Sequence, residues 1–582
     1  MTLNSILIIF FVTLIILIFL FGIAKLTISL INNLPSFYKK LFNIKVFFVR
    51  KKLQHYFYTY EQFKEEIIIF GKKYIKLNNY LFQNPNGQIK VPKNLGKNIF
   101  QVIIVFYSKN TKYFNYLINK KEYTRVVNPK SFNFFKIKIP KNNNFKIKKN
   151  KNDLILKTFY IKKTKKKLVL MVMLDGLDNS LSSFLNHSNK FFQPSNKLNS
   201  MWSNSPWTLP TFGNLLTGMY TSRHLNYKPM TYYSSSLSKK NLSSFINPNL
   251  TLFEFFQKNN FITGCYSPYV RINPTYNFDR GVDILKYCRE ESADEIIDNV
   301  IAQLEMFNAS SNFIFVHLFD AHHVVKGFNR IADYAMFPEN NFNYKEEIEK
   351  ENKKEINKKE FWEIKKKRMY VTVEEFIREK NFHEQKETIS SVQYCDLRLN
   401  YLYNYLSKNK FDDFTIMLFG DHGSRFKNFN ITGNALGKNH QNVGLFIKDK
   451  KIKSFSNKKN KFIETIDIFP SLISRYGKNN DIKLKKQFDG KNTIFSNTTK
   501  DYVIAENIYA EDFNLLINLN GSYLHSAYKI EKNTLIEKIS SKFYNKKENL
   551  VKFSNNNLKL KRLKSIEKKH MKNIKLDKIV KI

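Results

Sequence analysis

The chain has 582 residues and carries 96 lysines and arginines against 49 aspartates and glutamates, which gives a formal net charge of +47. A charge of this size often accompanies nucleic-acid or anionic-membrane binding. Here the lysines are scattered among Asn, Ile and Phe along the whole chain, which argues for a bulk compositional bias and against a nucleic-acid partner. The length allows a large core and two or more structural units. The 3 cysteines form no C-x-x-C pair and no even framework, which argues against a disulfide scaffold.

The N-terminal segment ILIIFFVTLIILIFLFGI, residues 6–23, is uncharged. At about 1.5 Å of rise per residue, a helix of this length comes close to the roughly 30 Å hydrocarbon core of a bilayer. No basic region precedes the segment and no small-residue cleavage site follows it. We therefore predict an uncleaved, single-pass membrane anchor over residues 1–31, in contact with the lipid bilayer, and not a signal peptide. A buried core helix is the alternative.

Two indications disagree about which side of the membrane the rest of the chain occupies. Lysines and arginines at positions 25, 39, 40 and 50–52 follow the span, and the positive-inside rule would keep the C-terminal bulk cytoplasmic. The chemistry described below favours an extracytoplasmic catalytic domain instead.

Residues 32–165 contain short runs rich in β-branched and aromatic residues. These are FQVIIVFYS, FNFFKIKIP and LILKTFYIKK, each bounded by Asn, Pro or Lys. Such runs are typical of strands, so we predict a small accessory region with β structure.

From residue 166 to residue 550, strand-like and helix-like runs alternate. LVLMVML, residues 168–174, is apolar enough for a strand buried on both faces of a parallel sheet. NFIFVHLF, FTIMLFG and VGLFIK are typical of strands, and TLFEFFQKNN and SSVQYCDLRLNYLYNYLSKN of helices. The alternation predicts an α/β fold. We interpret residues 327–386 as a charged helical insertion and residues 551–582 as a Lys/Asn-rich tail with little to bury.

Acidic and histidine residues stand where three of these predicted strands end. In open α/β sheets, the crevice beyond the carboxyl ends of the strands binds ligands. Carboxylate and imidazole groups suit Zn²⁺ or Mn²⁺, and an oxygen-rich set suits Mg²⁺ or Ca²⁺. Turn and cap roles are the alternative, since Asp is common in turns. We predict a divalent-metal site built from the strand-end residues Asp175, Asp421, His422, Asp320, His322 and His323.

The stretch SPWTLPTFGNLLTG, residues 205–218, holds two threonines and no charge. A metal ion can lower the pKa of a bound hydroxyl and make it a nucleophile near neutral pH. Pro210 biases the chain before it away from helix, so we expect Thr211 to be the N-cap of a helix that ends at Gly218. Thr208 would then lie near a helix N-terminus, which favours an anion such as phosphate. A plain capping role for Thr208 is the alternative.

Taken in order, these segments resemble the sulfatase branch of the alkaline phosphatase superfamily. Its members carry a C-x-P-S-R-x-x-L-L-T-G signature, and TLPTFGNLLTG runs parallel to it with Thr208 at the cysteine position. LDGL precedes this signature. HLFDAHH, SSVQYCDLRLNYLYNYL, GDHG, KNHQNVGLFI, ETIDIFPSLISRYG and KKENL follow where the family has its other motifs. The resemblance covers residues 165–550, approximately.

The resemblance implies an alkaline-phosphatase-like fold, with a central, mostly parallel sheet flanked by helices. It also implies a metal-dependent hydrolase or transferase with one or two divalent ions. By this resemblance Asp175, Asp421, His422 and the Thr208 hydroxyl would hold a metal. Thr208 would attack phosphorus or sulfur, and water or an acceptor alcohol would resolve the covalent intermediate.

The resemblance also assigns residues to the substrate and to a second ion. The groups expected at the oxygens or the leaving group of the substrate are His322, Lys438 and His440. The ligands available to a second ion are Asp320, His322, His323 and His440. The usual D-x-x-x-H spacing is absent, because Val324 stands where the histidine would be, so the number of ions stays open.

Two departures from the family pattern favour phosphate over sulfate chemistry. Thr208 cannot be oxidised to the formylglycine that sulfatases need, and Phe212 replaces the arginine of the signature. Threonine is the nucleophile of phospho-acting members. We therefore expect a membrane-anchored enzyme acting on phosphate esters or diesters of an envelope lipid or polysaccharide. A sulfuric ester hydrolase and a catalytically inactive binding protein on the same fold are the alternatives.

Overall fold

The computed structural model describes residues 66–69, 72–77, 80–84, 99–108, 113–129, 132–139, 145–148, 153–162, 165–226, 250–269, 272, 274, 278–287, 292–321, 373–423, 436–451, 462–478, 487–509, 512–531, 534–544, 550–551 and 557–574. The predicted anchor over residues 1–31 and most of the predicted insertion over residues 327–386 lie outside them. Across the described ranges, no helix has the length and apolar character needed to cross a membrane.

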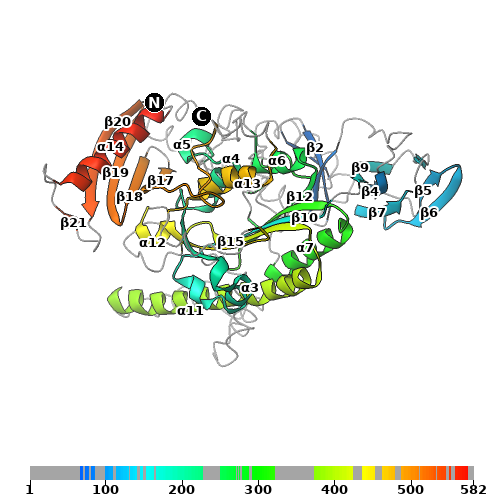
Figure 1. Cartoon of the computed structure of the whole chain (residues 1–582), viewed down its shortest axis with the longest axis horizontal. Helices are drawn as coiled ribbons and strands as arrows, with labels where there is room; N and C mark the ends of the chain where they lie inside the picture. The colour runs from blue at the N-terminus through cyan, green and yellow to red at the C-terminus, as the bar shows by residue number, and fades with distance from the viewer. Residues whose placement is uncertain are drawn as a thin grey trace, which may run out of the picture. The chain divides into compact units, whose positions relative to one another are not determined.

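A ten-stranded sheet runs through the structure in the order β1-β2-β3-β13-β12-β14-β10-β15-β16-β11 (Figure 1). Its central strands β13, β12, β14, β10 and β15 are parallel, and the outer strands pair antiparallel. The expected α/β fold with a mostly parallel central sheet is confirmed. In sheet order the strands span Glu66–Ile69, Lys72–Leu77, Tyr80–Asn84, Ile284–Tyr287, Phe261–Ser267, Ser311–Leu318, Lys167–Leu174, Asp413–Gly420, Asn442–Asp449 and Lys197–Trp202.

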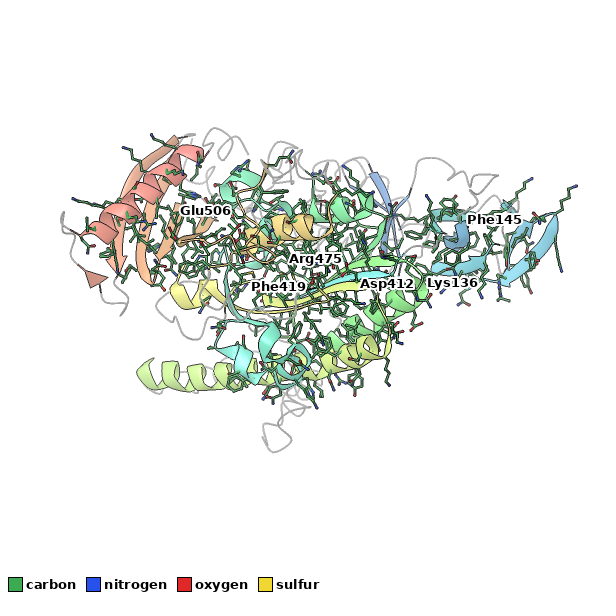
Figure 2. The ribbon with its side chains drawn as sticks, viewed as in Figure 1. Lys136, Phe145, Asp412, Phe419, Arg475 and Glu506 are labelled. Carbon is green, nitrogen blue, oxygen red and sulfur yellow. The ribbon has the colours of Figure 1, made fainter. Side chains whose placement is uncertain are left out.

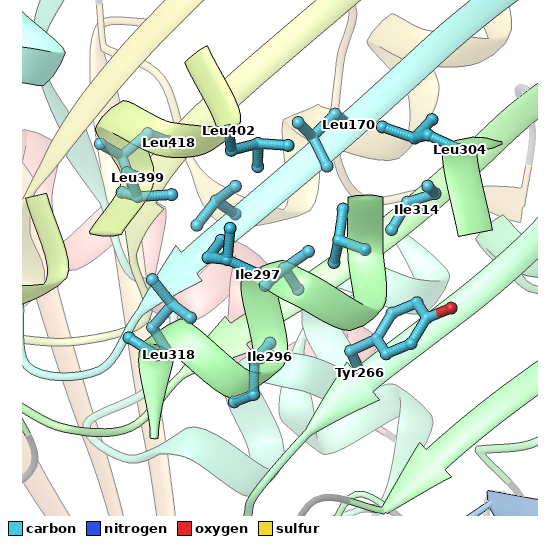
Figure 3. Packing of buried hydrophobic residues seen from close by; sticks show 14 of the residues in the cluster. Leu170, Tyr266, Ile296, Ile297, Leu304, Ile314, Leu318, Leu399, Leu402 and Leu418 are labelled. Carbon is cyan, nitrogen blue, oxygen red and sulfur yellow. The ribbon is translucent and has the colours of Figure 1, made fainter. Parts of the chain in front are cut away.

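Helices cover both faces of this sheet (Figure 1). On one face lie α3 (Asn186–Asn196), α7 (Ala293–Met306) and α11 (Val373–Lys408), and their apolar side chains pack on alternate strand residues such as Leu170, Ile314 and Leu418 (Figure 3). On the other face lie α4 (Thr208–Thr217), α6 (Leu252–Lys258) and α13 (Ile468–Tyr476). There Phe313 and Phe315 meet aromatic rings of α6 and α4. Since strand side chains alternate between faces, the second set of helices covers the odd-numbered residues of these strands.

Helix α4 begins earlier than the sequence suggests. Its first residue is Thr208, and the N-cap position belongs to Trp207, so the expected capping role of Thr211 is wrong. Pro210 is tolerated because the first turn of a helix has no intrahelical acceptor for its backbone N–H groups. The expected end of the helix is confirmed, because Gly218 is the C-cap with a left-handed φ of 66°.

The region before the sheet has β structure at each of the three runs named above. β4 (Ile99–Ser108), β7 (Phe132–Lys138) and β9 (Asp153–Lys162) form a three-stranded sheet. A second three-stranded sheet contains β5 (Tyr113–Ile118), β6 (Lys121–Val126) and β8 (Phe145–Lys148). Lys136 of β7 donates to Asn308 Oδ1 at 3.0 Å, and Phe159 of β9 packs on Phe307, directly after α7 (Figure 2). These contacts tie the first sheet to the segment directly after α7.

The C-terminal part contains a five-stranded antiparallel sheet covered by a helix. Its strands are β17 (Tyr502–Tyr509), β18 (Asp512–Leu519), β19 (Ser522–Glu531), β20 (Thr534–Tyr544) and β21 (Leu550–Val551). The interpretation of residues 551–582 as a tail with little to bury is wrong for α14 (Leu558–Asn573). Leu560, Leu563 and Ile566 of this helix are buried against the sheet. Their three-residue spacing places them on one helix face, which the high lysine content of the segment obscures.

The packing behind α4 predicts how stability depends on pH. The His224 ring lies against Gly213 of α4, and burial lowers the pKa of His224 to about 3. The unfolded chain takes up this proton below pH ~6.5, so the free energy of unfolding falls as the pH falls, by about 1.4 kcal/mol per unit until the folded-state pKa is reached.

We expect the difference in free energy of unfolding between the wild type and His224→Gln to shrink by about 2 kcal/mol between pH 6.5 and pH 5, measured by denaturant titration. Comparing the two proteins removes the contribution of the other histidines. A difference that stays constant over this interval would mean that the ring titrates normally in the folded protein.

Candidate functional site

Strand alternation brings three side chains to the face of the sheet that α4 covers. Asp175 and Asp421 directly follow the adjacent strands β10 and β15, whose last residues, Leu174 and Gly420, are paired. His317 lies one residue before the end of β14, paired with Met173 of β10. Donor atoms of Asp175, His317 and Asp421 all lie within 4.8 Å of one another, and all three residues are buried. The convergence expected at the strand ends therefore exists for two strands and gains a third member from within a strand.

The Thr208 hydroxyl lies at this group. Its Oγ1 donates to Asp175 Oδ2 at 3.1 Å and lies 3.4 Å from His422 Nε2. Thr208 is the first residue of α4 and is 2% exposed. The dipole of the helix makes the electrostatic potential around its N-terminus positive. The structure thus brings together Asp175, Thr208, Asp421 and His422, the four residues that the sequence assigns to one metal.

Hydrogen bonds around His422 fix which of its nitrogens faces the group. The backbone oxygen of Gly423 can only accept, and it lies 3.0 Å from Nδ1, so Nδ1 carries the proton. In the neutral ring, Nε2 then presents a lone pair 3.2 Å from Asp421 Oδ2 and 3.8 Å from Asp175 Oδ1. A backbone partner on the far nitrogen is the usual arrangement for a ligating histidine.

The electrostatics of this cluster favour a cation. Burial raises the pKa of Asp421, and the negative charge of Asp175 raises it further. Asp421 Oδ1 accepts the backbone N–H groups of Gly176 and His422, while its buried Oδ2 has no hydrogen-bond partner. Ligands of one ion at ~2.1 Å lie about 3.0–3.4 Å apart, close to the separations measured here. The residues present fit a divalent metal.

His317 is the member of the group that the sequence reasoning missed. Its Nε2 lies 3.3 Å from Asp175 Oδ2, and its Nδ1 lies 3.1 Å from Ser267 Oγ. The signal was present in the strand NFIFVHLF, where His317 occupies the same parity as Phe313 and Phe315, on the face that α4 covers. A histidine that interrupts the apolar side of a buried strand needs a polar partner.

The remaining strand-end residues either lie away from the buried Asp/His/Asp group or are not among the residues that the structure describes. Asp320 is 3% exposed, and its Oδ1 accepts the backbone N–H of Ala293, the first residue of α7, at 3.2 Å. Burial raises the pKa of Asp320 to about 6. Asp320 therefore faces a helix N-terminus and does not belong to the buried Asp/His/Asp group. His322 and His323, which the sequence predicts at the metal site, lie outside the described residues.

The two residues assigned from the KNHQNVGLFI segment lie in α12 (Lys438–Gln441). His440 is 5% exposed, and its ring packs on that of His422 with the centroids 5.1 Å apart. Its Nε2 donates to the backbone oxygen of Pro206 at 2.7 Å, two residues before Thr208. That nitrogen thus holds the loop before α4. The side chain of Lys438 lies outside the description.

Ser203 holds the same loop from another side. Its Oγ donates to the backbone oxygen of Asp421 and lies 2.8 Å from that of Ser205. Its backbone N–H donates to Gln441. The segment that carries Thr208 is therefore hydrogen-bonded to the loop that carries Asp421 and His422.

Comparisons with known proteins place this site in a family. The sulfatase family model matches residues 167–478, more than half of the chain. Among solved structures, BT4656 in complex with its substrate D-glucosamine-2-N,6-O-disulfate matches with a TM-score of 0.51 at 13% identity, over 70% of this chain and 99% of that one. At this identity the similarity concerns the fold alone.

A synthase and a transferase are also among the structural matches. Lipoteichoic acid synthase LtaP from Listeria monocytogenes has a TM-score of 0.41 at 13% identity, over 70% of this chain and 93% of its own. The C-terminal periplasmic domain of phosphoethanolamine transferase EptC from Campylobacter jejuni has a TM-score of 0.38 at 10% identity, over 56% and 96%.

No curated protein matches the chain in sequence. The family model spans both strands whose ends carry Asp175 and Asp421, together with the whole of α4. The chain belongs to the sulfatase family, and with it to the hydrolases and transferases of the alkaline phosphatase superfamily.

Proposed function

We propose that the chain is a metal-dependent hydrolase or transferase of phosphate esters or diesters, with Thr208 as its nucleophile. The observation that carries this proposal is the position of the Thr208 hydroxyl at the N-terminus of α4, 3.1 Å from Asp175 Oδ2 and 3.4 Å from His422 Nε2. Asp175, Thr208, Asp421, His422 and, in addition, His317 are the groups that would hold the ion. A bound divalent ion would offset the two buried carboxylates and lower the pKa of the hydroxyl.

The residues of the chain account for the two steps of the reaction. Thr208 Oγ1 gives up its proton and forms a bond to phosphorus, while the bond from phosphorus to the leaving oxygen breaks and that oxygen takes up a proton. Water or an acceptor alcohol then attacks the phosphorus of the phosphothreonine, the bond from phosphorus to Oγ1 breaks, and Oγ1 regains the proton that the attacking oxygen loses. Backbone N–H groups at the start of α4 favour the phosphate oxygens throughout.

The surroundings of Phe212 support phosphate over sulfate chemistry. Phe212 stands where the sulfatase signature has arginine, and here it is 0% exposed, with its ring 4.7 Å from that of Phe278 and 4.9 Å from that of Phe315. An apolar aromatic cluster thus replaces a cation that would orient an anion. Together with threonine in place of an oxidisable cysteine or serine, this argues against the formylglycine route.

The expected substrate is an ester in an envelope lipid or polysaccharide, because the segment over residues 6–23 has the composition of a membrane anchor. This part of the proposal rests on the sequence alone, as does an extracytoplasmic catalytic domain. Sulfuric ester hydrolysis is the second candidate function, favoured by membership of the sulfatase family.

Removal of the Thr208 hydroxyl tests the proposal directly. We expect Thr208→Ala to lose at least about 1,000-fold in kcat on aryl phosphate mono- or diesters, since the covalent step has no nucleophile. Initial rates are compared with those on an aryl sulfate, with and without an acceptor alcohol. Thr217→Ala is the matched control, because Thr217 is a buried threonine at the other end of the same helix that donates to Gly213.

Turnover that survives in Thr208→Ala, or that resists complete removal of divalent ions, contradicts the proposal. Faster turnover of the aryl sulfate supports the second candidate. A protein that holds no metal and turns over neither ester is the binding protein named among the alternatives.

The composition of the metal site gives a separate prediction. We expect Asp421→Asn and His317→Gln each to weaken Mn²⁺ or Zn²⁺ binding by about 10- to 100-fold, since each removes a donor or a group that orients one. Calorimetric titration of the metal-free protein measures this without any substrate. The control is His525→Gln, which changes a half-buried histidine in the C-terminal sheet. Wild-type affinity in His317→Gln would exclude His317 from the site.

A further inference from the structure

Asn204, four residues before Thr208, makes three side-chain hydrogen bonds, all of them away from the Asp/His group. It is 0% exposed. Its Nδ2 donates to Glu464 Oε1 at 2.9 Å and to the backbone oxygen of Ile504 at 2.7 Å, and its Oδ1 accepts the backbone N–H of Ile466 at 3.1 Å. Its backbone oxygen accepts the backbone N–H of Glu506 at 2.8 Å (Figure 2). One side chain therefore joins the loop before the nucleophile to two other segments of the chain.

Glu464 is the main partner of Asn204, and it is itself fixed from several directions. Its Oε1 also accepts the backbone N–H of Ile504 at 2.9 Å, and its Oε2 forms an ion pair with Lys500. Lys500 pairs with Asp467 as well, at 2.6 Å. Burial opposes the charge of Lys500, yet the two carboxylates raise its pKa above the ordinary value. Burial raises the pKa of Glu464, and the charge of Lys500 opposes this shift. Glu464 is thereby fixed as an acceptor whose position does not depend on solvent.

These residues give a physical role to the segment ETIDIFPSLISRYG, which the chemistry leaves unexplained. Glu464 is the N-cap of the short helical turn η7 (Thr465–Asp467), and Asp467 ends this turn as the N-cap of α13. Through Asn204 and Ile504, this turn is bonded both to the loop before α4 and to β17 of the C-terminal sheet. The opposite side of the loop is bonded to the metal-site segment through Ser203 and His440. The loop is thus held between two independent sets of contacts.

We infer that Asn204 is a positioning residue for Thr208, and that Glu464 acts through it as the acceptor of the Asn204 side-chain amide. The inference rests on the proposed function, because it states what sets the distance from Thr208 Oγ1 to Asp175 and His422. Loss of the Asn204 contacts frees the loop on one side, and a displacement of about 1 Å at a nucleophile can lower the rate by roughly 100-fold. The other four groups that would hold the ion remain in place, and no group that contacts the substrate is removed, so metal affinity and KM change little.

Asn204→Ala tests the inference. We expect kcat to fall by about 10- to 100-fold, with KM and the Mn²⁺ dissociation constant within about threefold of the wild type. Amide hydrogen exchange of residues 203–209, followed by mass spectrometry, is expected to accelerate. The matched control is Asn518→Ala, which removes a buried asparagine from the same C-terminal sheet, where Asn518 Oδ1 accepts the backbone N–H of Gly521 at 2.9 Å. We expect it to lose stability without losing kcat.

Glu464→Gln separates positioning from stability. It keeps an oxygen for Asn204 Nδ2 but removes the charge that faces Lys500, so we expect lower stability with kcat within about threefold of the wild type. The inference is overturned if kcat follows the free energy of unfolding across all three variants, or if exchange of residues 203–209 is unchanged in Asn204→Ala. The exchange measurement needs no turnover. A wild type without esterase activity therefore refutes the proposed function while the positioning of the loop is still tested.

Discussion

Two carboxylates, Asp175 and Asp421, are buried next to each other at the ends of adjacent parallel strands, and the surrounding structure depends on how their charges are offset. Like charges in a buried site cannot both persist without a proton or a cation. The neighbouring groups are arranged for the cation. Two backbone N–H groups fix one oxygen of Asp421, and the other oxygen lies 3.2 Å from the Nε2 of His422, whose Nδ1 is bonded to the backbone oxygen of Gly423.

Helix α4 complements this acidic group from above the sheet. A side chain at the first helical position points back toward the helix N-terminus, so Thr208 is directed at the strand ends. One turn further along, Phe212 points into the aromatic layer on the same face of the sheet. The same helix therefore presents its polar end to the carboxylates and its apolar side to Phe315. Gly213 lies on its far side against the His224 ring, at a distance that leaves no room for a Cβ.

Local patterns were sufficient to predict much of this arrangement. Apolar runs identified the central strands, and the polar residues that end them identified Asp175, Asp421 and His422. The sequence could not show which residues face each other, because that depends on the register between strands and on where the helices begin. His317 lies inside an apolar run, so only the pairing of β14 with β10 shows that it faces Asp175. Asp320 ends a strand like the others, yet α7 begins beside it and takes its carboxylate as a capping group. The sequence did not reveal helix α14 as a packed element, because lysines separate its buried Leu560, Leu563 and Ile566.

The C-terminal sheet lies beyond the residues that the sulfatase family model matches, yet it contacts the loop that carries the nucleophile. The sheet contributes no member of the buried Asp/His/Asp group, but its first strand bonds to Asn204 and to Glu464, and so bears on the loop before Thr208. A nucleophile on a loop fixed from one side could satisfy its hydrogen bonds at several distances from the metal ligands. Fixing the loop from two sides removes that freedom before substrate arrives, so less ordering is required during the reaction. The buried ion pairs of Lys500 add rigidity where a solvated pair would not, because no water competes for Glu464.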